Sequence, residues 1–530
     1  MEESRTTNSI RNIKTGIIVQ LVNKIMAFVV RTFFIKMLNS EYLGVNGLFT
    51  NILTILSFAE LGIGTAIIFN MYKPVANHDY EKIKSLMSLY KKSYNTIGVI
   101  VFVLGLLVIP FMNIIIKDAP NIKENLTGIY LLFLFNTSAS YFFTYKKSII
   151  AAHQKQRIID NIDSIFYLVK SILEIIFLCL TKNFIVYLVI QILGTFIENI
   201  IISIKADKMY PYLKEKNVSK LNKEESKSIF ENVKSLVIYK FGGVIMSGTD
   251  NILISMLVNV NIVGLCSNYV LIINSIRSII LAALNGITAS VGNLNAIGSK
   301  KKKEEVFYQI TFVNYIIYSF CAIAFIILLN PFIKLWLGQE YVLSLLVSIA
   351  LSFSFFIEGL RNPGYTYRIT LGLFKKAKIT PYIGAISNIL FSVIFCKLIG
   401  VAGIYIGTAI AQLISYSWID PYLIHKYEFN SSVGGYFKKY IIYITVFIIN
   451  ICICLFLSSL IKVDGIFGFV VNCLLVCIIP NTVNIVIYRK SQEFIEVREK
   501  IIKPMVAKYK KNFLKKYNNK NYSKRRKTYD

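Results

Sequence analysis

The chain has 530 residues, of which 55% are hydrophobic and 17% are charged, and its mean hydropathy is +0.57. Soluble domains usually carry about 25% charged and about 45–50% apolar residues, so this composition excludes an ordinary soluble enzyme and a disordered chain. The formal net charge of +30 would fit a nucleic-acid-binding protein, but its meaning depends on where the basic residues lie. The composition therefore predicts a polytopic membrane protein.

Apolar runs long enough to cross a bilayer occur fourteen times along the sequence. A spanning helix needs about 17–25 residues, whereas the spans of a β-barrel would be about ten residues of alternating polarity. The sequence therefore predicts an all-α polytopic membrane protein with about 14 transmembrane helices. The runs cover residues 13–38, 43–69, 94–116, 125–145, 158–180, 183–204, 230–257, 261–289, 306–330, 341–360, 379–398, 402–424, 437–460 and 465–488.

Basic residues concentrate at both ends of the chain and in every second connection between these runs. The intervening connections hold only Lys117, Lys123, Lys182, Lys334, Lys397 and Lys462. Such an alternation is what the positive-inside rule predicts, with both termini in the cytoplasm. The net charge then reflects membrane topology, and nucleic acid is not an expected partner. The tail 489–530, with its Lys524-Arg525-Arg526-Lys527 cluster, is expected to lie near anionic membrane lipids or to be solvated.

A short internal repeat predicts two related halves. The segment 34–53 (FIKMLNSEYLGVNGLFTNIL) resembles 253–272 (LISMLVNVNIVGLCSNYVLI), and Gly44 matches Gly264 after one inserted residue. Because each half has an even number of spans, the halves would be related by an axis along the membrane normal. We expect two pseudo-symmetric six-helix bundles around a central cavity, followed by two additional helices.

The domain boundaries follow from these spans. The expected parts are a cytoplasmic head 1–12, an N-terminal six-helix lobe 13–204, a charged cytoplasmic linker 205–229, a C-terminal six-helix lobe 230–424, two extra transmembrane helices 425–488 and a basic cytoplasmic tail 489–530. Within the connection before the third span, Ile83, Leu86, Met87 and Tyr90 fall on one helical face, which indicates an interfacial helix over 79–92.

Two segments resemble a known family. The stretch 34–67 (FIKMLNSEYLGVNGLFTNILTILSFAELGIGTAI) looks like the opening of the Wzx-type polysaccharide flippases. The stretch 371–410 (LGLFKKAKITPYIGAISNILFSVIFCKLIGVAGIYIGTAI), with Asn388 and the closing run Gly400 to Thr408, resembles their second half. These flippases belong to the multidrug/oligosaccharidyl-lipid/polysaccharide exporter superfamily, and the resemblance covers roughly residues 10–490.

This resemblance implies a transporter of the bacterial plasma membrane rather than an enzyme. Its substrate would be an oligosaccharide unit on undecaprenyl diphosphate, moved across the membrane by alternating access for capsule, exopolysaccharide or wall polysaccharide. The expected partners are this lipid-linked glycan, anionic lipids at the basic tail, and a polysaccharide polymerase with its glycosyltransferases. No cofactor or metal is expected.

Charged residues inside apolar runs are the candidates for transport, because each costs about 2.5–3.5 kcal/mol at the membrane centre on insertion scales. Lys24 and Arg31 are seven residues apart and share a helical face, so we expect them to contact the diphosphate or the glycan. Glu60, Asp250 and Arg277 complete the expected transport set. Coupling to a proton or sodium gradient would use Glu60, Asp250 or Glu358.

Other buried charges have a structural interpretation or suggest gates. Lys170 and Glu174 lie four residues apart, which predicts a structural ion pair within one helix. The repeat gives Arg31 and Asp250 matching positions in the first and seventh spans, and the matched second and eighth spans carry Glu60 and Arg277. These two opposite-charge pairs could close the two ends of the cavity alternately, or all four residues could face water without meeting.

Three alternatives remain open from the sequence. A cation-coupled multidrug exporter would need buried carboxylates and few fixed cations, whereas Lys24, Arg31 and Arg277 favour an anionic cargo. A lipid II flippase would use the same chemistry. A membrane-embedded glycosyltransferase or polymerase would need acid–base residues on a sizeable outer loop, and the outer connections are short.

Overall fold

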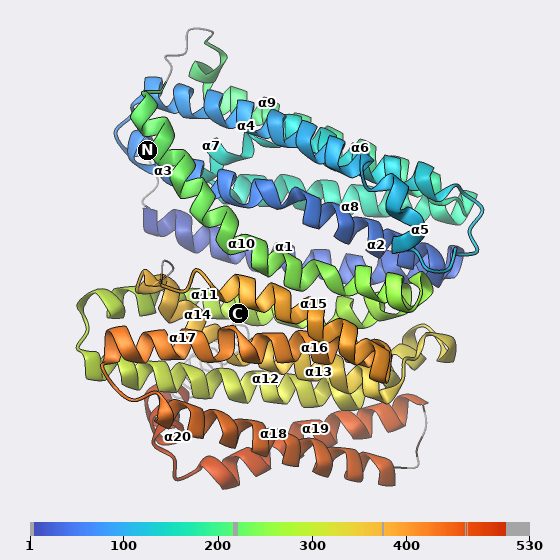
Figure 1. Ribbon diagram of the computed structural model, residues 1–530, viewed down its shortest axis with the longest axis vertical. Coiled ribbons are helices and arrows are strands. Elements are labelled where there is room, and N and C mark those ends of the chain that lie inside the picture. Colours follow the sequence, from blue (N-terminus) through green and yellow to red (C-terminus); the bar gives the residue numbers. More distant parts are fainter. Residues whose placement is uncertain (1–4, 216–220, 374–375, 462, 464, 505–530) are drawn as a thin grey trace, which may run out of the picture. The chain divides into compact units, whose positions relative to one another are not determined.

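The computed structural model describes residues 5–215, 221–373, 376–461, 463 and 465–504. These residues form helices and connecting turns, without a strand in the described part (Figure 1). The chain divides into two compact units. Unit 1 holds the described residues of Met1–Ala283, Leu337–Val347 and Lys378–Ser415, and unit 2 holds those of Leu284–Trp336, Ser348–Ala377 and Tyr416–Asp530. The units differ from the two predicted lobes, whose boundaries stay a prediction, and the Lys524–Lys527 cluster lies outside the described residues.

Unit 1 contains most of the first half of the chain. Its helices are α1 (Arg5–Met37), α2 (Ser40–Leu56), α3 (Glu60–Ala76), α4 (Tyr80–Leu106), α5 (Met112–Ile115), α6 (Leu126–Thr144), α7 (Lys147–Ala152), α8 (Gln156–Thr181), α9 (Phe184–Met209), α10 (Lys223–Leu257), the first part of α11 (Val260–Ile297), α15 (Thr380–Ile399) and α16 (Val401–Ile414).

Unit 2 contains the end of α11 and most of the C-terminal third. Its helices are α12 (Lys300–Trp336), most of α13 (Leu345–Leu360), α14 (Asn362–Thr370), α17 (Tyr416–Ile424), α18 (Gly434–Leu460), α19 (Gly465–Tyr488) and α20 (Gln492–Val497). Short 3₁₀ and π turns connect several of them: Ser57–Ala59, Ile109–Phe111, Pro211–Lys214, Gln339–Tyr341, His425–Phe429 and Arg498–Ile502.

Eleven helical segments of the described chain are long and apolar enough to cross a membrane. They coincide with eleven of the fourteen predicted spans. The other three predicted spans, 13–38, 43–69 and 230–257, are also helical and correspond to α1, to α2 with α3, and to α10. The predicted all-α polytopic membrane fold is therefore confirmed.

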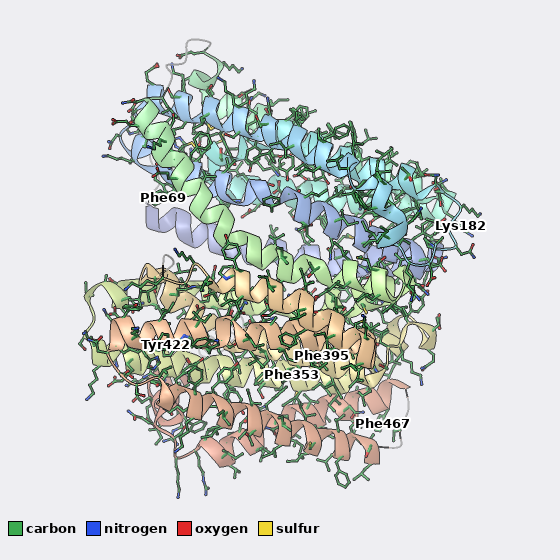
Figure 2. All side chains as sticks on the ribbon, in the orientation of Figure 1. Phe69, Lys182, Phe353, Phe395, Tyr422 and Phe467 are labelled. Atoms are coloured by element: carbon green, nitrogen blue, oxygen red, sulfur yellow. The ribbon has the colours of Figure 1, made fainter. Side chains whose placement is uncertain are left out.

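The outer surface of these helices is apolar, as a lipid-facing surface requires. Large side chains extend from the helices in both units (Figure 2). Phe69 on α3 is 72% exposed and Phe467 on α19 is 68% exposed. Such extensive exposed apolar area is unusual for a soluble monomer, so the burial pattern agrees with the composition.

The connections of unit 1 lie at two opposite ends (Figure 1). The α1–α2, α8–α9 and α10–α11 turns share one end, which we call the turn end, whereas the α3–α4 turn and α7 lie at the other. One hydrophobic cluster fills the turn end around Phe49 and another fills the opposite end around Tyr94. The connections predicted to face outward therefore lie together.

The two repeated segments meet at the turn end through their matched glycines. A Cβ atom on Gly44 would lie 2.0 Å from the carbonyl oxygen of Val260, and one on Gly264 would lie 2.0 Å from that of Ser40. Each glycine thus packs against the carbonyl four residues before the other glycine. A side chain at either position is incompatible with this approach, and the reciprocal contact is the arrangement that a pseudo-twofold repeat produces.

The predicted interfacial helix over 79–92 is wrong as a separate element. These residues form the first part of α4, which runs without interruption from Tyr80 to Leu106. Ile83 and Leu86 on its apolar face are 0% and 1% exposed because they pack into the cluster around Tyr94. An amphipathic stripe predicts a buried face, and here protein rather than lipid covers it.

In unit 2, aromatic stacking holds α18 against α12 and α13, and a hydrogen bond joins α19 to α12. The rings of Tyr315 and Tyr443 stack at 4.4 Å, and those of Phe356 and Phe447 at 3.9 Å. The hydroxyl of Tyr315 also donates a hydrogen bond to Asn484 Oδ1 (3.1 Å). Aromatic pairs add about 0.5–1.5 kcal/mol beyond area burial, so α18 and α19 are firmly attached parts of this unit.

Candidate functional site

A cavity of about 180 Å³, measured as the space open to a water-sized molecule, lies inside unit 1 between α1, α2, α8, α9 and α11. Drug-sized pockets usually measure about 300–1,000 Å³, so this space suits a small ion or one group of a larger molecule. Its polar lining residues are Arg31, Asn46, Tyr167, Lys170, Glu174, Tyr187 and Gln191.

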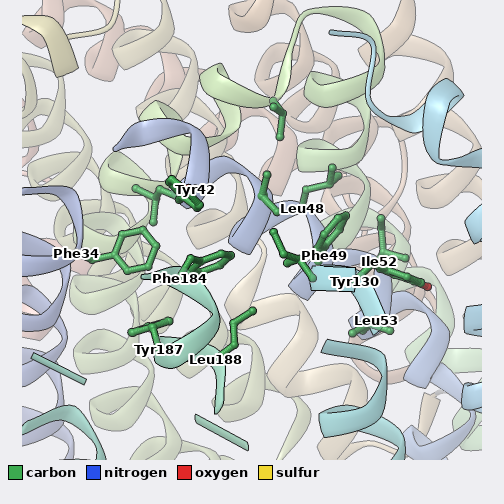
Figure 3. Packing of buried hydrophobic residues seen from close by; sticks show 14 of the residues in the cluster. Phe34, Tyr42, Leu48, Phe49, Ile52, Leu53, Tyr130, Phe184, Tyr187 and Leu188 are labelled. Atoms are coloured by element: carbon green, nitrogen blue, oxygen red, sulfur yellow. The ribbon is translucent and has the colours of Figure 1, made fainter. Parts of the chain in front are cut away.

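An aromatic cluster borders the cavity: Phe34 and Tyr187 belong both to the cavity lining and to the packed residues of Figure 3. Phe34 contacts the rings of Phe184 and Tyr187 at 5.8 and 5.1 Å, and Tyr42 contacts Phe184 at 5.2 Å. These edge-to-face contacts fix α1 against α2 and the start of α9. Arg31 lies one helical turn before Phe34, so the same packing sets the position of its guanidinium.

Arg31 is held by neutral groups. Its Nη1 atom donates hydrogen bonds to Ser267 Oγ (2.7 Å) and Asn268 Oδ1 (3.3 Å) on α11. Within the described part of the chain these two partners are neutral and no carboxylate forms an ion pair with Arg31. The described lining of the cavity holds two cations, Arg31 and Lys170, and one carboxylate, Glu174, so a guanidinium without an ion-pair partner of its own is available for an anionic ligand.

Lys170 and Glu174 line the same cavity, and the predicted ion pair between them is wrong for the described structure. The methylene stem of Lys170 lies against Gly194, where a Cβ atom would come within 2.8 Å of Lys170 Cδ. Its ammonium lies 5.9 Å from the centre of the Tyr167 ring. Glu174 is 3% exposed, and its Oε1 atom has no hydrogen-bond partner among the described residues. Packing against α9 therefore overrides the favourable i,i+4 spacing.

Lys24 does not line the cavity. It is half-buried on α1, two turns before Arg31, on the same stripe as Ala27 and Arg31, which both face the cavity. Lys24 and Arg31 thus share one face of α1, with Arg31 at the cavity and Lys24 nearer the opposite end of unit 1.

Two partly exposed carboxylates, on α8 and α9, form ion pairs. Lys147 on α7 contacts Asp163 (3.1 Å) and Glu198 (2.9 Å). Partial burial disfavours the charge of Lys147, but the two carboxylates outweigh this effect and raise its pKa. Asp163 and Glu198 are therefore explained by local charge compensation.

Asp250 lies in a second polar cluster, formed by α10, α15 and α16. Thr408 Oγ1 donates to Asp250 Oδ1 (3.0 Å), and Asn388 Nδ2 donates to Thr408 Oγ1 (2.8 Å). Thr249 Oγ1 donates to Asn388 Oδ1 (2.9 Å). Among the described residues no Lys or Arg pairs with Asp250. Asp250 is thus bonded to one hydroxyl of the described chain, in a polar cluster that the Asn388 amide and the Thr249 hydroxyl extend.

Glycines make this cluster possible. A Cβ atom on Gly403 would lie 2.1 Å from the Phe395 carbonyl, and one on Gly407 would lie 2.4 Å from the Ser392 nitrogen. The resulting close approach of α16 to α15 brings Thr408 to Asn388. Both residues belong to the segment that resembles the flippases, but their convergence on Asp250 was not predicted. A search for polar residues one helical turn from small residues could have indicated it.

Glu60 and Arg277 also have uncharged partners. Tyr94 donates to Glu60 Oε1 (2.9 Å), and Arg277 Nη1 donates to Asn274 Oδ1 (2.6 Å). The structure joins neither Arg31 to Asp250 nor Glu60 to Arg277, so the exchange of two charge pairs stays a prediction. Glu358 lies on α13 in unit 2 and is half-buried.

Comparisons with known proteins show which solved structures share this architecture. No protein-family model matches the chain, and no curated protein matches it. The lipid II flippase MurJ, in an inward closed conformation, superposes with a TM-score of 0.59 at 17% identity, covering 89% of this chain and 98% of that one. An inward-facing multidrug resistance MATE family transporter of the MOP superfamily superposes with a TM-score of 0.57 at 15% identity. The match covers 76% of this chain and 96% of that one.

A mutant of the Vibrio cholerae MATE transporter VcmN gives a TM-score of 0.51 at 13% identity, covering 81% and 99%. The chain has their fold. At these identities the likeness concerns architecture, a polytopic helical bundle shared by multidrug transporters and a lipid flippase. These relatives in structure are transporters rather than enzymes, and they carry cargoes of different chemistry.

Proposed function

We propose that this protein is a flippase for undecaprenyl-diphosphate-linked oligosaccharides in the bacterial plasma membrane, with both termini in the cytoplasm. The observation that supports it most is the cavity with two cations, Arg31 and Lys170, of which Arg31 has only neutral partners in the described part. A diphosphate would supply negative charge to Arg31 and Lys170, which outnumber the single carboxylate of the described lining, Glu174. The sugars would follow a polar path and the isoprenoid tail would stay in lipid.

The charge of the cavity argues against a cationic drug as cargo. A fixed guanidinium repels a cationic drug and attracts a phosphate, for which its planar fork is geometrically matched. A multidrug exporter is therefore the weaker alternative.

A lipid II flippase is the second candidate, favoured by the similarity to MurJ over 89% of this chain. Lipid II carries the same diphosphate, so Arg31 does not separate the two cargoes. The segments 34–67 and 371–410 resemble polysaccharide flippases and favour the first candidate. Depleting the protein should then stop export of a surface polysaccharide without causing cell lysis. Lysis with accumulated lipid II would instead identify lipid II as the cargo.

Cation coupling at Asp250 extends the proposal. The Asp250 carboxylate and the Thr408 hydroxyl oxygen are hard ligands of the kind that bind a small cation, and a proton could also neutralise the carboxylate. Glu60, bonded to Tyr94, and Glu358 are further candidates. Transport by purified protein in vesicles should respond to an imposed sodium or proton gradient, and an unchanged rate under both gradients would contradict coupling.

Alternating exchange of charge pairs is the mechanism proposed for the cargo path. In another state Arg31 would pair with Asp250, or Glu60 with Arg277, each pair offsetting part of its desolvation cost. Arg31→Asp and Asp250→Arg should each stop export, and the double swap should restore part of it. The same rescue is expected for Glu60→Arg with Arg277→Glu. If neither double variant recovers export although all variants fold, the exchange is overturned and the cargo proposal stays intact.

A further inference from the structure

Segments from the two halves of the sequence touch at the turn end of unit 1, and three of these contacts bear on its closure. The first is the backbone contact between Gly44 and Gly264. The second is the pair of hydrogen bonds from Arg31 to α11. The third joins Ser255 Oγ to the carbonyl oxygen of Ile115 (2.8 Å). Together these contacts close this end of the unit.

The glycine contact has little holding strength of its own. It is made by backbone atoms with no side chain between them, so only dispersion forces and exclusion of solvent favour it. The two backbones pack closely there, but in the described structure no hydrogen bond or ion pair joins them at the two glycines. The Arg31 bridge adds a polar contact beside them, from α1 to Ser267 and Asn268 on α11.

Ser267 connects the bridge to the glycine contact. Its Oγ atom accepts a hydrogen bond from Arg31 Nη1 (2.7 Å) and donates one to the carbonyl oxygen of Gly264 (2.7 Å). Asn268 adds a longer bond to the same guanidinium nitrogen (3.3 Å). The cation of the cavity is thus tied, through one hydroxyl, to the glycine that packs against α2.

We propose that Ser267 and Asn268 form a latch on Arg31 that keeps the turn end closed, and that a diphosphate entering the cavity opens it by taking the guanidinium. This inference rests on the proposed function, which makes Arg31 the contact for an anionic cargo. It adds a mechanism: the residue that binds cargo is the residue that holds the closure.

The relative strength of the competing bonds favours release. Ser267 and Asn268 offer neutral oxygens, whereas a phosphate offers charged oxygens that a guanidinium can bind in a bidentate manner. Hydrogen bonds with charge on both partners are roughly twice as strong as neutral ones. A ligand shifts a conformational equilibrium only through its different affinity for the two states. Here the anion binds the unlatched state more tightly, because Arg31 is then uncommitted.

The test follows closure with a cysteine pair at the turn end. A Cβ atom on Gly47 would lie 3.5 Å from Val263 Cγ1, so Gly47→Cys with Val263→Cys places two thiols within bonding reach when this end is closed. The pair is introduced into a full-length background that lacks the eight native cysteines and still supports export. The rate of oxidative cross-linking then reports the closed population.

Removing the latch should open this end without any ligand. In Ser267→Ala with Asn268→Ala, we expect cross-linking to slow about tenfold, because hydrogen bonds to a charged group are lost. Ser275→Ala is the matched control, since its hydroxyl on the same helix bonds only within α11, to Leu271 O (2.7 Å), in the described part. Cross-linking of the double variant at the parental rate would overturn the latch.

Inorganic pyrophosphate is the probe for release, compared with sodium chloride at equal ionic strength. Pyrophosphate should slow cross-linking in the parent and have no further effect in the Ser267→Ala, Asn268→Ala variant. An unchanged rate in the parent would overturn anion-driven opening. The flippase proposal is tested separately: it fails if Arg31→Ala exports polymer normally. Failure of the latch and failure of the flippase proposal therefore give different results.

Discussion

Two buried arginines of this protein have opposite surroundings. Arg31 in unit 1 lines a cavity and bonds to neutral oxygens of Ser267 and Asn268. Arg368 in unit 2 is 0% exposed and forms an ion pair with Asp420 at 2.7 Å. The Arg368 guanidinium also lies 5.4 Å from the Tyr365 ring. The comparison teaches that a charge compensated inside the bundle maintains structure, whereas a charge left to neutral groups is available for a ligand.

The same contrast separates the carboxylates. Asp163 and Glu198 share Lys147, whereas Asp250 is bonded to Thr408. A charge in a membrane-spanning bundle is costly, and an ion pair is the simplest compensation. Some buried charges have only hydroxyl or amide groups as hydrogen-bond partners in the described structure. For these, binding of a transported counter-ion or cargo explains why the free-energy cost of burying the charge is tolerated.

Replacing Arg31 should have the largest effect. We expect Arg31→Ala to lower polymer export by about two orders of magnitude, since losing one partner of a buried charge contact costs about 2–5 kcal/mol. Arg31→Lys should keep part of the activity because it retains charge but lacks the bidentate fork. Export is measured against the amount of protein inserted in the membrane, and normal export by Arg31→Ala would remove this residue from the site.

Breaking the structural pair should affect stability instead. Arg368→Ala leaves Asp420 buried without its cation and should cost about 3–5 kcal/mol, seen as a lower unfolding temperature of the purified protein. The apolar exchange Arg368→Met with Asp420→Leu should recover most of the loss, because a well-packed apolar pair can replace a buried ion pair. If the double exchange folds normally but exports nothing, the pair would have a role in transport.

Neutralising Asp250 is expected to have an intermediate effect. Asp250→Asn keeps the shape and the hydrogen bond from Thr408 but removes the charge, so transport should fall about tenfold and lose its dependence on the cation gradient. Asp163→Asn, in an already compensated pair, serves as the comparison. Equal gradient dependence in Asp250→Asn and the parent protein would exclude coupling at this cluster.

A matched lysine pair gives the smallest expected effects. Lys170→Met should lower export a few-fold with little change in unfolding temperature, because the ammonium faces the cavity without an ion pair in the described structure. Lys147→Met should lower stability by about 1–3 kcal/mol, since it leaves Asp163 and Glu198 uncompensated. Export per folded molecule should then stay near normal. A reversed pattern would contradict the distinction between paired and available charges.

The sequence alone determined the membrane-spanning helices and several charges of the site. Bilayer thickness imposes a minimum length on each apolar run. Helices such as α6 and α12 can therefore be predicted from the sequence without knowing which helices pack against them. The cost of buried charge also singles out Arg31 and Asp250 from their apolar surroundings. The repeat indicated that Gly44 and Gly264 occupy equivalent positions, which a shared backbone geometry requires.

Only the tertiary structure decided which partner each charge has. Spacing of four residues predicted a bond between Lys170 and Glu174, but contact with Gly194 on α9 directs the lysine elsewhere. Ser267 and Thr408 are ordinary polar residues in apolar helices, and their importance comes from residues more than 150 positions away. Helical periodicity describes the face of one helix, whereas the identity of the helix opposite depends on how closely glycines allow backbones to approach.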